Sequence, residues 1–243
     1  MNLVRSLSNS PSYNLALEEM LFAEYVDDFL LFYINAPSVI LGSNQAVQNE
    51  VDSVFCAQNE VAVVRRKSGG GAVYHDMGNL NFSFIRTNSD DSMATTADFL
   101  NPVVSWVAEL GVQLNIGERK DLWTNDGFKI SGTASRVRKN RVLQHGTLLF
   151  DTNQQMLAGA LAAKDYDMTL KATASVRSKT KNLRSYLETD AVPVFEMASF
   201  ATALLTIVGE YYATQLKTNL DFEQEKIYQL AAFYRQPEWT YKK

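Results

Sequence analysis

Residues 61–86 read Val-Ala-Val-Val-Arg-Arg-Lys-Ser-Gly-Gly-Gly-Ala-Val-Tyr-His-Asp-Met-Gly-Asn-Leu-Asn-Phe-Ser-Phe-Ile-Arg. An apolar run ends in three cations, meets three consecutive glycines and resumes from Ala72 to His75. The chain then turns at residues 76–78 and alternates between apolar and polar residues from Leu80 to Ile85. This order predicts a strand, a glycine loop, a second strand, a turn and a third strand.

The glycine loop at residues 69–71 is a candidate anion site. Glycine has no Cβ atom and can take positive φ, so a ligand can lie against the backbone amides there. Arg65, Arg66 and Lys67 precede the loop, and guanidinium groups bind carboxylate or phosphate in a bidentate way. A structural alternative is that the glycines only form a sharp hairpin or bulge. The loop lacks the Gly-Lys-Ser/Thr ending of a Walker loop and the helix that follows a dinucleotide fingerprint.

The third strand is expected to have one polar and one apolar face. Side chains alternate across a strand, so Asn79, Asn81 and Ser83 share one face and Leu80, Phe82 and Phe84 the other. A polar row is therefore expected beside the glycine loop.

A second informative stretch covers residues 121–151. Turn residues at 125–127 and 139–140 separate three predicted strands at 121–124, 128–137 and 142–150. Period two places Lys129 on the same face as Ser131, Thr133 and Ser135. Taken alone, such a lysine is more often a solvated surface residue, because lysine side chains are mostly exposed.

Both stretches resemble the lipoate-protein ligase family. Residues 65–79 resemble its signature Arg-Arg-x-Ser-Gly-Gly-Gly-Ala-Val-x-His-Asp-x-Gly-Asn at every fixed position. The phrases at 129–134, which opens with the lysine that is essential in the family, and at 145–149 also match. Further matches lie at Asn14-Leu15-Ala16, Glu18-Glu19, Gly42-x-x-Gln45, Ser175-Val176-Arg177-Ser178 and Asn182-Leu183, so the resemblance covers nearly the whole chain.

The resemblance implies an α+β fold, the biotin/lipoate-protein ligase catalytic-domain fold, with a mixed, largely antiparallel β-sheet packed with helices. We expect the glycine loop and the Lys129 strand side by side in that sheet. The expected catalytic domain covers residues 1–234. Residues 235–243 are expected to begin a linker to a small C-terminal accessory domain that this chain lacks.

The implied activity has two steps, activation of lipoate with ATP to lipoyl-AMP and transfer of the lipoyl group to a specific lysine of a lipoyl domain. The resemblance makes Lys129 the catalytic residue and Asp121 the ligand of a nucleotide-bound Mg²⁺. The family's Arg-Asn-Asp reads Arg119-Lys120-Asp121 here, which adds a cation beside that aspartate. The substrate- and ATP-binding residues that it implies are Arg66, Ser68, Gly69, Gly70, Gly71, Ala72, Val73, Tyr74, His75, Asn79, Asn81, Ser131, Gly132, Arg136, His145, Gly146 and Thr147.

Two alternatives stay open. The chain could be a lipoyl or octanoyl transferase that takes an activated acyl group, but the thiol version needs a cysteine nucleophile, and Cys56 lies on a predicted helix and is expected in the core. It could also be a non-catalytic lipoate-binding module, although binding alone does not require Lys129.

The implied partners are the lipoyl domains of 2-oxoacid dehydrogenase E2 subunits and the glycine cleavage H protein. A separate accessory-domain protein is a further partner that the resemblance allows. Such acceptors are typically acidic, whereas this chain has a net charge of −4. A local basic patch is therefore expected to attract them. The candidates are Arg136, Arg138, Lys139 and Arg141 at a hairpin tip and the basic run between Lys164 and Arg184.

Composition narrows the class further. The chain has 243 residues, 46% hydrophobic and 21% charged, which suits one large globular domain. Its acidic balance argues against nucleic acid as the main partner. A single cysteine excludes an intrachain disulfide. We expect a cytoplasmic protein without a membrane partner, because there is no signal-peptide pattern and no apolar run of about 18 residues.

Helical periodicity predicts further elements. These are a first helix capped by Ser12, one helix over residues 48–60, and others near 98–110, 153–163, 195–212 and 223–233.

Overall fold

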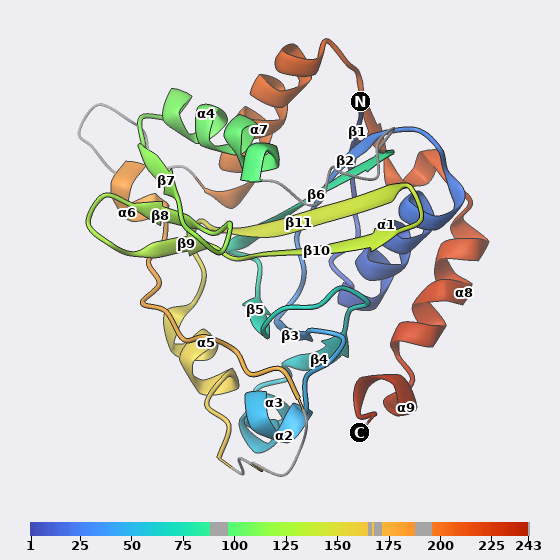
Figure 1. Ribbon diagram of the computed structural model, residues 1–243, viewed down its shortest axis with the longest axis vertical. Helices are drawn as coiled ribbons and strands as arrows, with labels where there is room; N and C mark the ends of the chain where they lie inside the picture. The colour runs from blue at the N-terminus through green and yellow to red at the C-terminus, as the bar shows by residue number, and fades with distance from the viewer. Residues whose placement is uncertain (88–96, 165–166, 168–171, 188–195, 243) are drawn as a thin grey trace.

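The computed structural model describes residues 1–87, 97–164, 167, 172–187 and 196–242 (Figure 1). Its largest sheet has the strand order β10-β11-β6-β2-β1-β12. The strands are β1 (Asn2–Arg5), β2 (Phe29–Tyr33), β6 (Asn79–Thr87), β10 (Thr133–Arg138), β11 (Arg141–Leu149) and β12 (Leu216–Thr218). Neighbours from β10 to β2 are antiparallel, whereas β1 lies parallel to both β2 and β12. The predicted mixed, largely antiparallel α+β fold is thus confirmed.

Helices cover both faces of this sheet (Figure 1). On one face lie α4 (Asn101–Glu109), which continues the 3-10 turn Ala97–Leu100, and α7 (Met197–Tyr212). On the other face lie α1 (Pro11–Glu24) and α8 (Gln224–Tyr234), which pack on each other. Strand β6 shows the predicted alternation, because Leu80, Phe82 and Phe84 enter the α4–α7 core and the polar row faces away from it. Helix α1 begins two residues earlier than predicted, since Ser10 rather than Ser12 caps it by accepting from the Tyr13 amide.

A second sheet carries the glycine loop. Its order is β4-β3-β5, with β3 (Ser38–Leu41), β4 (Ala62–Arg65) and β5 (Val73–His75). Helices α2 (Val47–Glu50), α3 (Ser53–Gln58) and α5 (Gln154–Ala160) pack around it. The single helix predicted over residues 48–60 is wrong, because the chain extends at Val51 and Asp52 then caps a new helix by accepting from the Phe55 amide. Cys56 is buried in this core, as expected.

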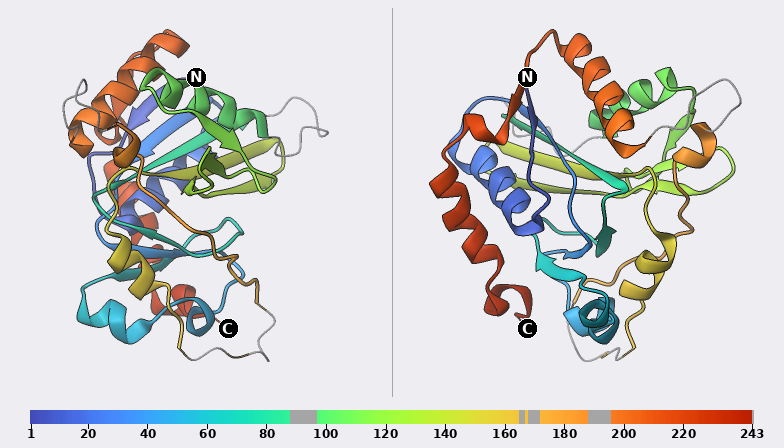
Figure 2. Two further views of the ribbon diagram at one scale, coloured as in Figure 1. Left: turned by 90° about the vertical axis from the view of Figure 1, so that its left-hand side faces the viewer. Right: turned by 180° about the vertical axis from the view of Figure 1, so that it is seen from behind.

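A third sheet holds Lys129. It consists of β7 (Leu114–Ile116), β8 (Leu122–Thr124) and β9 (Lys129–Ser131). The strand predicted over residues 128–137 is split at Gly132, where the backbone changes partner from β8 to β11 and exchanges hydrogen bonds with Thr147. The expectation of one sheet carrying both the glycine loop and Lys129 is therefore wrong. The two belong to separate sheets. Figures 1 and 2 show the β4-β3-β5 sheet below β10 and β11 and the β7-β8-β9 sheet beside the end of these strands.

The last segment packs on the domain. Helix α9 (Pro237–Thr240) lies against β4, inside the range expected to begin a linker. The remaining elements are α6 (Arg184–Leu187) and the 3-10 turn Asn219–Asp221. The start of the helix predicted at residues 195–212 falls partly outside the described residues, as do parts of the loop at 87–96 and of the basic run at 164–184. None of the helices that the structure describes is long and apolar enough to cross a membrane.

Candidate active site

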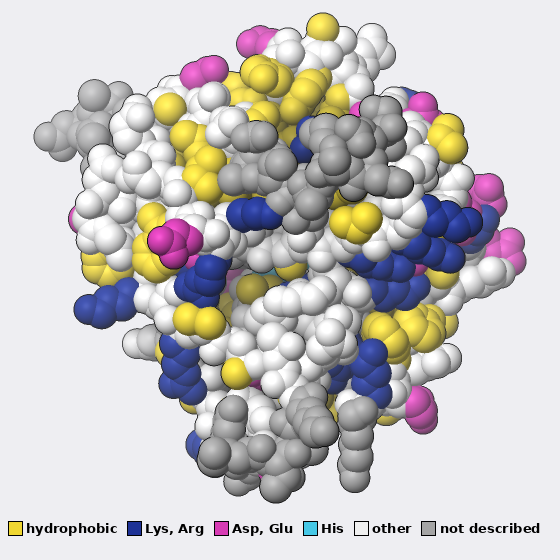
Figure 3. Space-filling model, in the orientation of Figure 1, with side chains coloured by type: hydrophobic (Ala, Val, Ile, Leu, Met, Phe, Trp, Pro, Cys, Tyr) yellow, Lys and Arg dark blue, Asp and Glu magenta, His cyan; other side chains and the backbone are white. Residues whose placement is uncertain are grey.

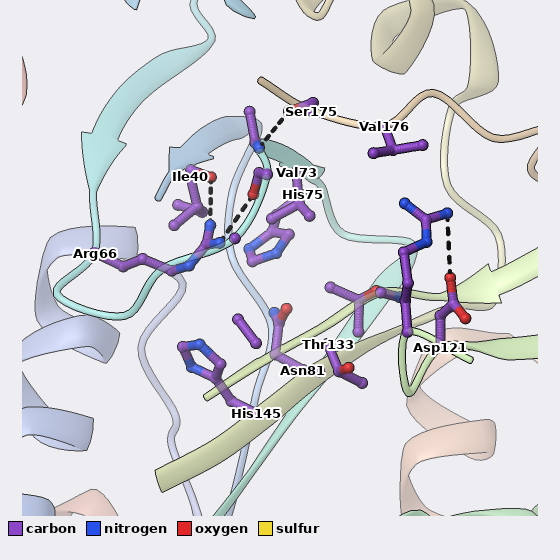
Figure 4. A pocket seen from close by; sticks show the side chains of 18 of the residues that line it. Ile40, Arg66, Val73, His75, Asn81, Asp121, Thr133, His145, Ser175 and Val176 are labelled. Carbon is purple, nitrogen blue, oxygen red and sulfur yellow. Dashed lines mark hydrogen bonds and ion pairs between the residues drawn. The ribbon is translucent and has the colours of Figure 1, made fainter. Parts of the chain in front are cut away.

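A cavity opens where the three sheets meet (Figure 4). Its wall is formed by Leu15, Tyr33, Ile40, Arg66, Gly70–Val73, His75, Asn81, Arg119, Asp121, Lys129, Gly132–Ala134, His145–Thr147 and Thr173–Val176. Four of its apolar or aromatic members, Leu15, Tyr33, Ile40 and Val73, come from four different elements. Polar and charged groups surround this apolar part, so the cavity suits a ligand with an apolar chain and an anionic head.

The glycine loop forms one wall of the cavity. Gly70 has φ +87°, a conformation that glycine takes without strain. Gly42 lies directly beneath, and any Cβ on it would overlap the Gly70 carbonyl oxygen. Arg66 holds the loop from behind, since its guanidinium donates to the carbonyls of Ile40, Gly69 and Gly71 at 2.6–2.9 Å and its Nε donates to Ser68 at 2.9 Å.

A buried chain of hydrogen bonds extends from Arg66 to helix α1. Ser68 Oγ lies 2.7 Å from His145 Nε2, and His145 Nδ1 lies 2.9 Å from Glu18 Oε2. Glu18 also accepts from Ser83 at 2.6 Å. Burial alone would raise the pKa of Glu18, but the charge and hydrogen bond of His145 outweigh it and the pKa lies below its ordinary value. Burial lowers the pKa of Arg66 to about 10, so its guanidinium stays charged at neutral pH.

Of the three cations before the glycines, only Arg66 lines the cavity. Arg65 is fully buried and donates to the carbonyls of Gly42, Gln45 and Thr240 at 2.6–2.9 Å. Lys67 pairs with Glu19 at 2.9 Å. Arg65 and Arg66 therefore hold the loop and its surroundings in place. The amides of residues 69–71 bond to none of the described residues and are the donors that an anion can use there.

Lys129 lies on the opposite wall. Its Nζ is 3.0 Å from Asp121 Oδ2, and Arg119 approaches the same carboxylate at 3.6 Å. Burial alone would raise the pKa of Asp121, but hydrogen bonds from Trp123 and Lys129 and the charge of Lys129 lower it. Gly132 borders the lysine, since a Cβ on it would lie 3.9 Å from the Lys129 ammonium, an ordinary contact distance. Within the described residues, no group of three or more His, Cys, Asp or Glu side chains gathers as a metal site.

Lys120 sits outside this cavity, in a shallow hollow beside it. Its φ is +59°, in the left-handed region that asparagine tolerates better than lysine. The left-handed backbone thus explains why an asparagine, the residue of the family pattern, suits this position.

His75 is held deep in the cavity. Its Nδ1 lies 3.0 Å from the Asn35 side-chain amide. Burial, with the neighbouring charges of Arg66 and His145, lowers the pKa of His75 to about 3, so the ring is neutral at physiological pH. Beside it, Asn81 accepts from Asn79 and donates to the Tyr33 carbonyl.

Residues 172–176 cross the glycine loop as a strap (Figure 4). Ser175 Oγ accepts from the Ala72 amide at 2.8 Å and from Gln45 at 3.0 Å. Glu50 accepts from the Ser175 amide. The strap therefore occupies the backbone amide of Ala72, the donor next to the glycine loop.

Most residues named from the sequence lie on the cavity wall, and their roles as ligand contacts remain predictions. Six do not line it. Ser68, Tyr74, Asn79 and Ser131 are buried behind the wall, Gly69 is partly exposed and its carbonyl accepts from Arg66, and Arg136 pairs with Glu19. Sequence reasoning did not single out Leu15, Tyr33, Ile40, Arg119, Thr133, Ala134 and Thr173–Val176 as site residues. Leu15, Thr133, Ala134 and Ser175-Val176 stood in matched phrases, whereas Tyr33 and Ile40 read only as buried strand residues.

Comparisons with known proteins agree with this geometry. A family model described as the lipoyl protein ligase A/B catalytic domain matches residues 10–208. The chain is 37% identical over 243 residues to lipoate-protein ligase LplJ of Bacillus subtilis, covering 96% of this chain and 71% of that protein. A bipartite lipoate protein ligase of Thermoplasma acidophilum, described together with its E2 lipoyl domain, is 28% identical with a TM-score of 0.79, over 99% of this chain and 95% of that one. A crystal structure of lipoate-protein ligase A bound with ATP is 26% identical with a TM-score of 0.78, over 99% and 98%.

Proposed function

The chain belongs to the lipoyl protein ligase A/B catalytic-domain family, and from this membership we propose that it activates lipoate with ATP and transfers the lipoyl group to a lysine of a lipoyl domain. One observation carries the proposal. The glycine loop and Lys129, which lie in different sheets, face one cavity that also has an apolar part.

Activation requires an electrophile, because a carboxylate does not acylate an amine at neutral pH. A lipoate oxygen forms a bond to the α-phosphorus of ATP, the bond from that phosphorus to the bridging oxygen breaks, and pyrophosphate leaves with the electron pair. Negative charge gathers around phosphorus in the transition state, where preorganised cations and N–H donors lower the barrier. The Lys129 ammonium and the amides of the glycine loop are suited to this task.

Lys129 acts as a positioned charge in both steps. Asp121 holds its ammonium at the cavity wall until a ligand oxygen replaces part of that contact. In the transfer step the neutral acceptor amine attacks the acyl carbonyl, the bond from carbon to the adenylate oxygen breaks, AMP leaves with the electron pair, and the amine nitrogen releases one proton to solvent. Lys129 then polarises the carbonyl and forms no covalent bond.

Asp121 is also the group that would hold a nucleotide-bound Mg²⁺. Magnesium is commonly bound by one or two carboxylates together with substrate phosphates, so a single aspartate fits this mode. When bound, the ion would neutralise phosphate charge. The Lys129 and Arg119 side chains compete for the same carboxylate, so this chain's own cations supply part of that neutralisation.

The thiol-dependent transferase alternative finds no support in the site. Cys56 lies in the core of the β4-β3-β5 sheet and is not part of the cavity wall. Burial raises the pKa of its thiol to about 11, so little thiolate forms at neutral pH.

The acceptor class follows from the family. The bipartite relative was described with an E2 lipoyl domain, and we propose such domains of 2-oxoacid dehydrogenases, and the glycine cleavage H protein, as acceptors of this chain. We extend the proposal to a separate accessory-domain protein that assists the reaction. Adding such a protein to the exchange assay below tests this extension.

Exchange of labelled pyrophosphate into ATP tests the activation step by itself. We expect exchange that depends on lipoate and needs no acceptor protein. A chain that binds lipoate but shows no exchange, with or without an accessory protein, is a transferase or a binding module instead.

A further inference from the structure

One buried donor in the cavity has no partner. His75 is 4% exposed and lines the cavity wall, and its Nε2 has no hydrogen-bond partner among the described residues. Burying a polar group without a partner is unfavourable, so such a group calls for an explanation. A ligand atom that completes the hydrogen bond is one.

A chain of amides determines which ring nitrogen carries the proton. Asn14 Nδ2 donates to the Ser8 carbonyl at 2.8 Å, so this amide cannot be turned around without setting its oxygen against that carbonyl. The same nitrogen donates to Asn35 Oδ1 at 2.8 Å, which fixes the Asn35 amide as well. Asn35 Nδ2 therefore donates to His75 Nδ1. A neutral imidazole that accepts at Nδ1 carries its proton at Nε2, so the unpartnered atom is a donor.

The chain is itself well anchored. Ser6 Oγ donates to Asn14 Oδ1 at 2.6 Å, and Asn14 and Asn35 are each at most 1% exposed. Asn14 and Asn35 are thus positioning residues for His75, and neither lines the cavity.

His75 and Lys129 lie on different sides of the cavity. Figure 4 places His75, Asn81 and His145 on one side and Asp121, the ion-pair partner of Lys129, on the other. Val73 borders the Lys129 side, since its Cγ1 and the Lys129 ammonium each lie 3.9 Å from the place that a Cβ on Gly132 would occupy. His75 follows Val73 by two residues on the same face of β5, roughly 7 Å along the strand. A ligand with its carboxyl end at Lys129 therefore passes Val73 before it reaches His75.

We propose that the Nε2–H of His75 recognises the sulfur-bearing ring of lipoate and favours it over the plain alkyl end of octanoate. The proposal rests on the function above, because that function sets the carboxyl end of the substrate at Lys129. The far end then reaches His75. A ring sulfur is a weak hydrogen-bond acceptor, whereas a methyl or methylene group leaves the donor unsatisfied.

Binding of the two acids to the full chain tests the proposal. His75→Phe keeps a ring of similar size and removes the donor. We expect its preference for lipoate over octanoate, measured as the ratio of the two dissociation constants by calorimetry, to fall about two- to tenfold. Octanoate should bind as tightly as before or more tightly. Equal weakening of both acids would assign His75 to the shared carboxylate or to packing and overturn the proposal, as would an unchanged ratio.

Nuclear magnetic resonance tests the proton position directly. His75 and His145 are the only histidines in the chain, so long-range proton–nitrogen correlation spectra of the wild type and His75→Phe assign both rings. We expect His75 as the Nε2–H tautomer. In Asn35→Ala the ring should populate both tautomers and the lipoate preference should fall. Retention of a pure Nε2–H tautomer in that variant contradicts the positioning role of Asn35.

Tyr13→Phe is the matched control. Tyr13 precedes Asn14 on α1, its hydroxyl bonds to Gln224 and Asn219, and it does not line the cavity. Loss of the Tyr13 hydroxyl removes buried hydrogen bonds from the same helix and should leave the ratio of the lipoate and octanoate dissociation constants unchanged. Failure of the proposed function is distinguishable, because the wild type would then show no lipoate-dependent exchange whatever the His75 variants do to binding.

Discussion

The two charged walls of the cavity are built in different ways. On the glycine-loop wall, Arg65 and Arg66 are buried and donate to backbone carbonyls and a serine hydroxyl. On the opposite wall, Lys129 and Arg119 share the single carboxylate of Asp121, and the Arg119 side chain is 48% exposed. Two cations on one anion leave positive charge for a ligand. The first wall therefore supplies shape and amide donors, and the second supplies charge that can change partner when a substrate binds.

The largest effect should come from removing charge on the second wall. Lys129→Ala should lower lipoate-dependent pyrophosphate exchange about 10²–10³-fold, the range typical of losing one preorganised donor to a transition state. The free energy of unfolding should fall by about 1–3 kcal/mol, because the residue is not part of the apolar core but the buried Asp121 carboxylate loses its nearest cation and keeps Arg119 at 3.6 Å.

Lys179→Ala is the control for this variant. Lys179 is exposed and lies outside the cavity wall, and its backbone carbonyl accepts from the Lys129 amide. The substitution therefore removes a cation near Lys129 without changing the cavity. Near-normal exchange by a folded Lys129→Ala protein would remove Lys129 from the mechanism and with it the contrast between the walls.

The next effect concerns the stability of the first wall. Arg65→Met should lower the free energy of unfolding by about 2–4 kcal/mol, because the carbonyls of Gly42, Gln45 and Thr240 lose a buried donor. Urea denaturation measures it. Lys67→Met removes a partly exposed ion pair with Glu19, but Glu19 still pairs with Arg136. The free energy of unfolding should therefore fall by about 1 kcal/mol or less. Similar losses in both variants would show that Arg65 does not organise the loop.

The sequence predicted local features well where the pattern depends on local physics. The alternation from Asn79 to Phe84 gave the correct polar and apolar faces of β6, because side chains alternate between the two faces within a single strand, although both faces of β6 are buried. The resemblance of both stretches to one family also predicted that the glycine loop and Lys129 lie at one site. Composition and spacing alone could not predict this.

What it missed depends on long-range contacts. The side chains of Arg65 and Arg66 look equivalent in sequence, and only the positions of α9 and Ile40 show which carbonyls each one holds. The strand break at Gly132 is determined by Thr147, a residue on another strand. The orphaned donor of His75 depends on Asn14, which stood in a matched phrase without a role, and on Asn35, which stood in none.

A smaller effect separates two neighbouring glycines of the first wall. Gly70→Ala should lower the free energy of unfolding by about 1–2 kcal/mol, because φ there is +87°. It should also raise the KM for lipoate, since its Cβ would approach the Arg66 guanidinium. In Gly69→Ala the new Cβ meets nothing within 4 Å and φ lies outside the left-handed region, so both quantities should stay close to wild type. Equal effects at both positions would mean that the loop is not held in one conformation.

The smallest effect concerns a third charged region, the turn between β10 and β11. Two of the four cations expected to attract the acceptor are engaged elsewhere. Arg136 pairs with Glu19 and lies over the Phe22 ring, and Arg141 is buried against the carbonyls of Leu21 and Asp27. Arg138 and Lys139 remain exposed at the turn. Figure 3 shows basic side chains gathered on the side of the molecule where Figure 1 places this turn.

If Arg138 and Lys139 attract an acidic lipoyl domain, they act through long-range charge, which salt screens over about 10 Å at 0.1 M ionic strength. Arg138→Ser with Lys139→Ser should therefore slow transfer from preformed lipoyl-AMP about two- to fivefold at low salt and limiting acceptor. The difference should disappear near 0.5 M salt, and pyrophosphate exchange, which involves no acceptor, should not change. Lys217→Ser alters charge on β12, at the opposite edge of the same sheet, and should affect neither rate. Equal loss in transfer and exchange would instead assign the turn to the nucleotide, and a loss that persists at high salt would mean direct contact with the acceptor rather than attraction at a distance.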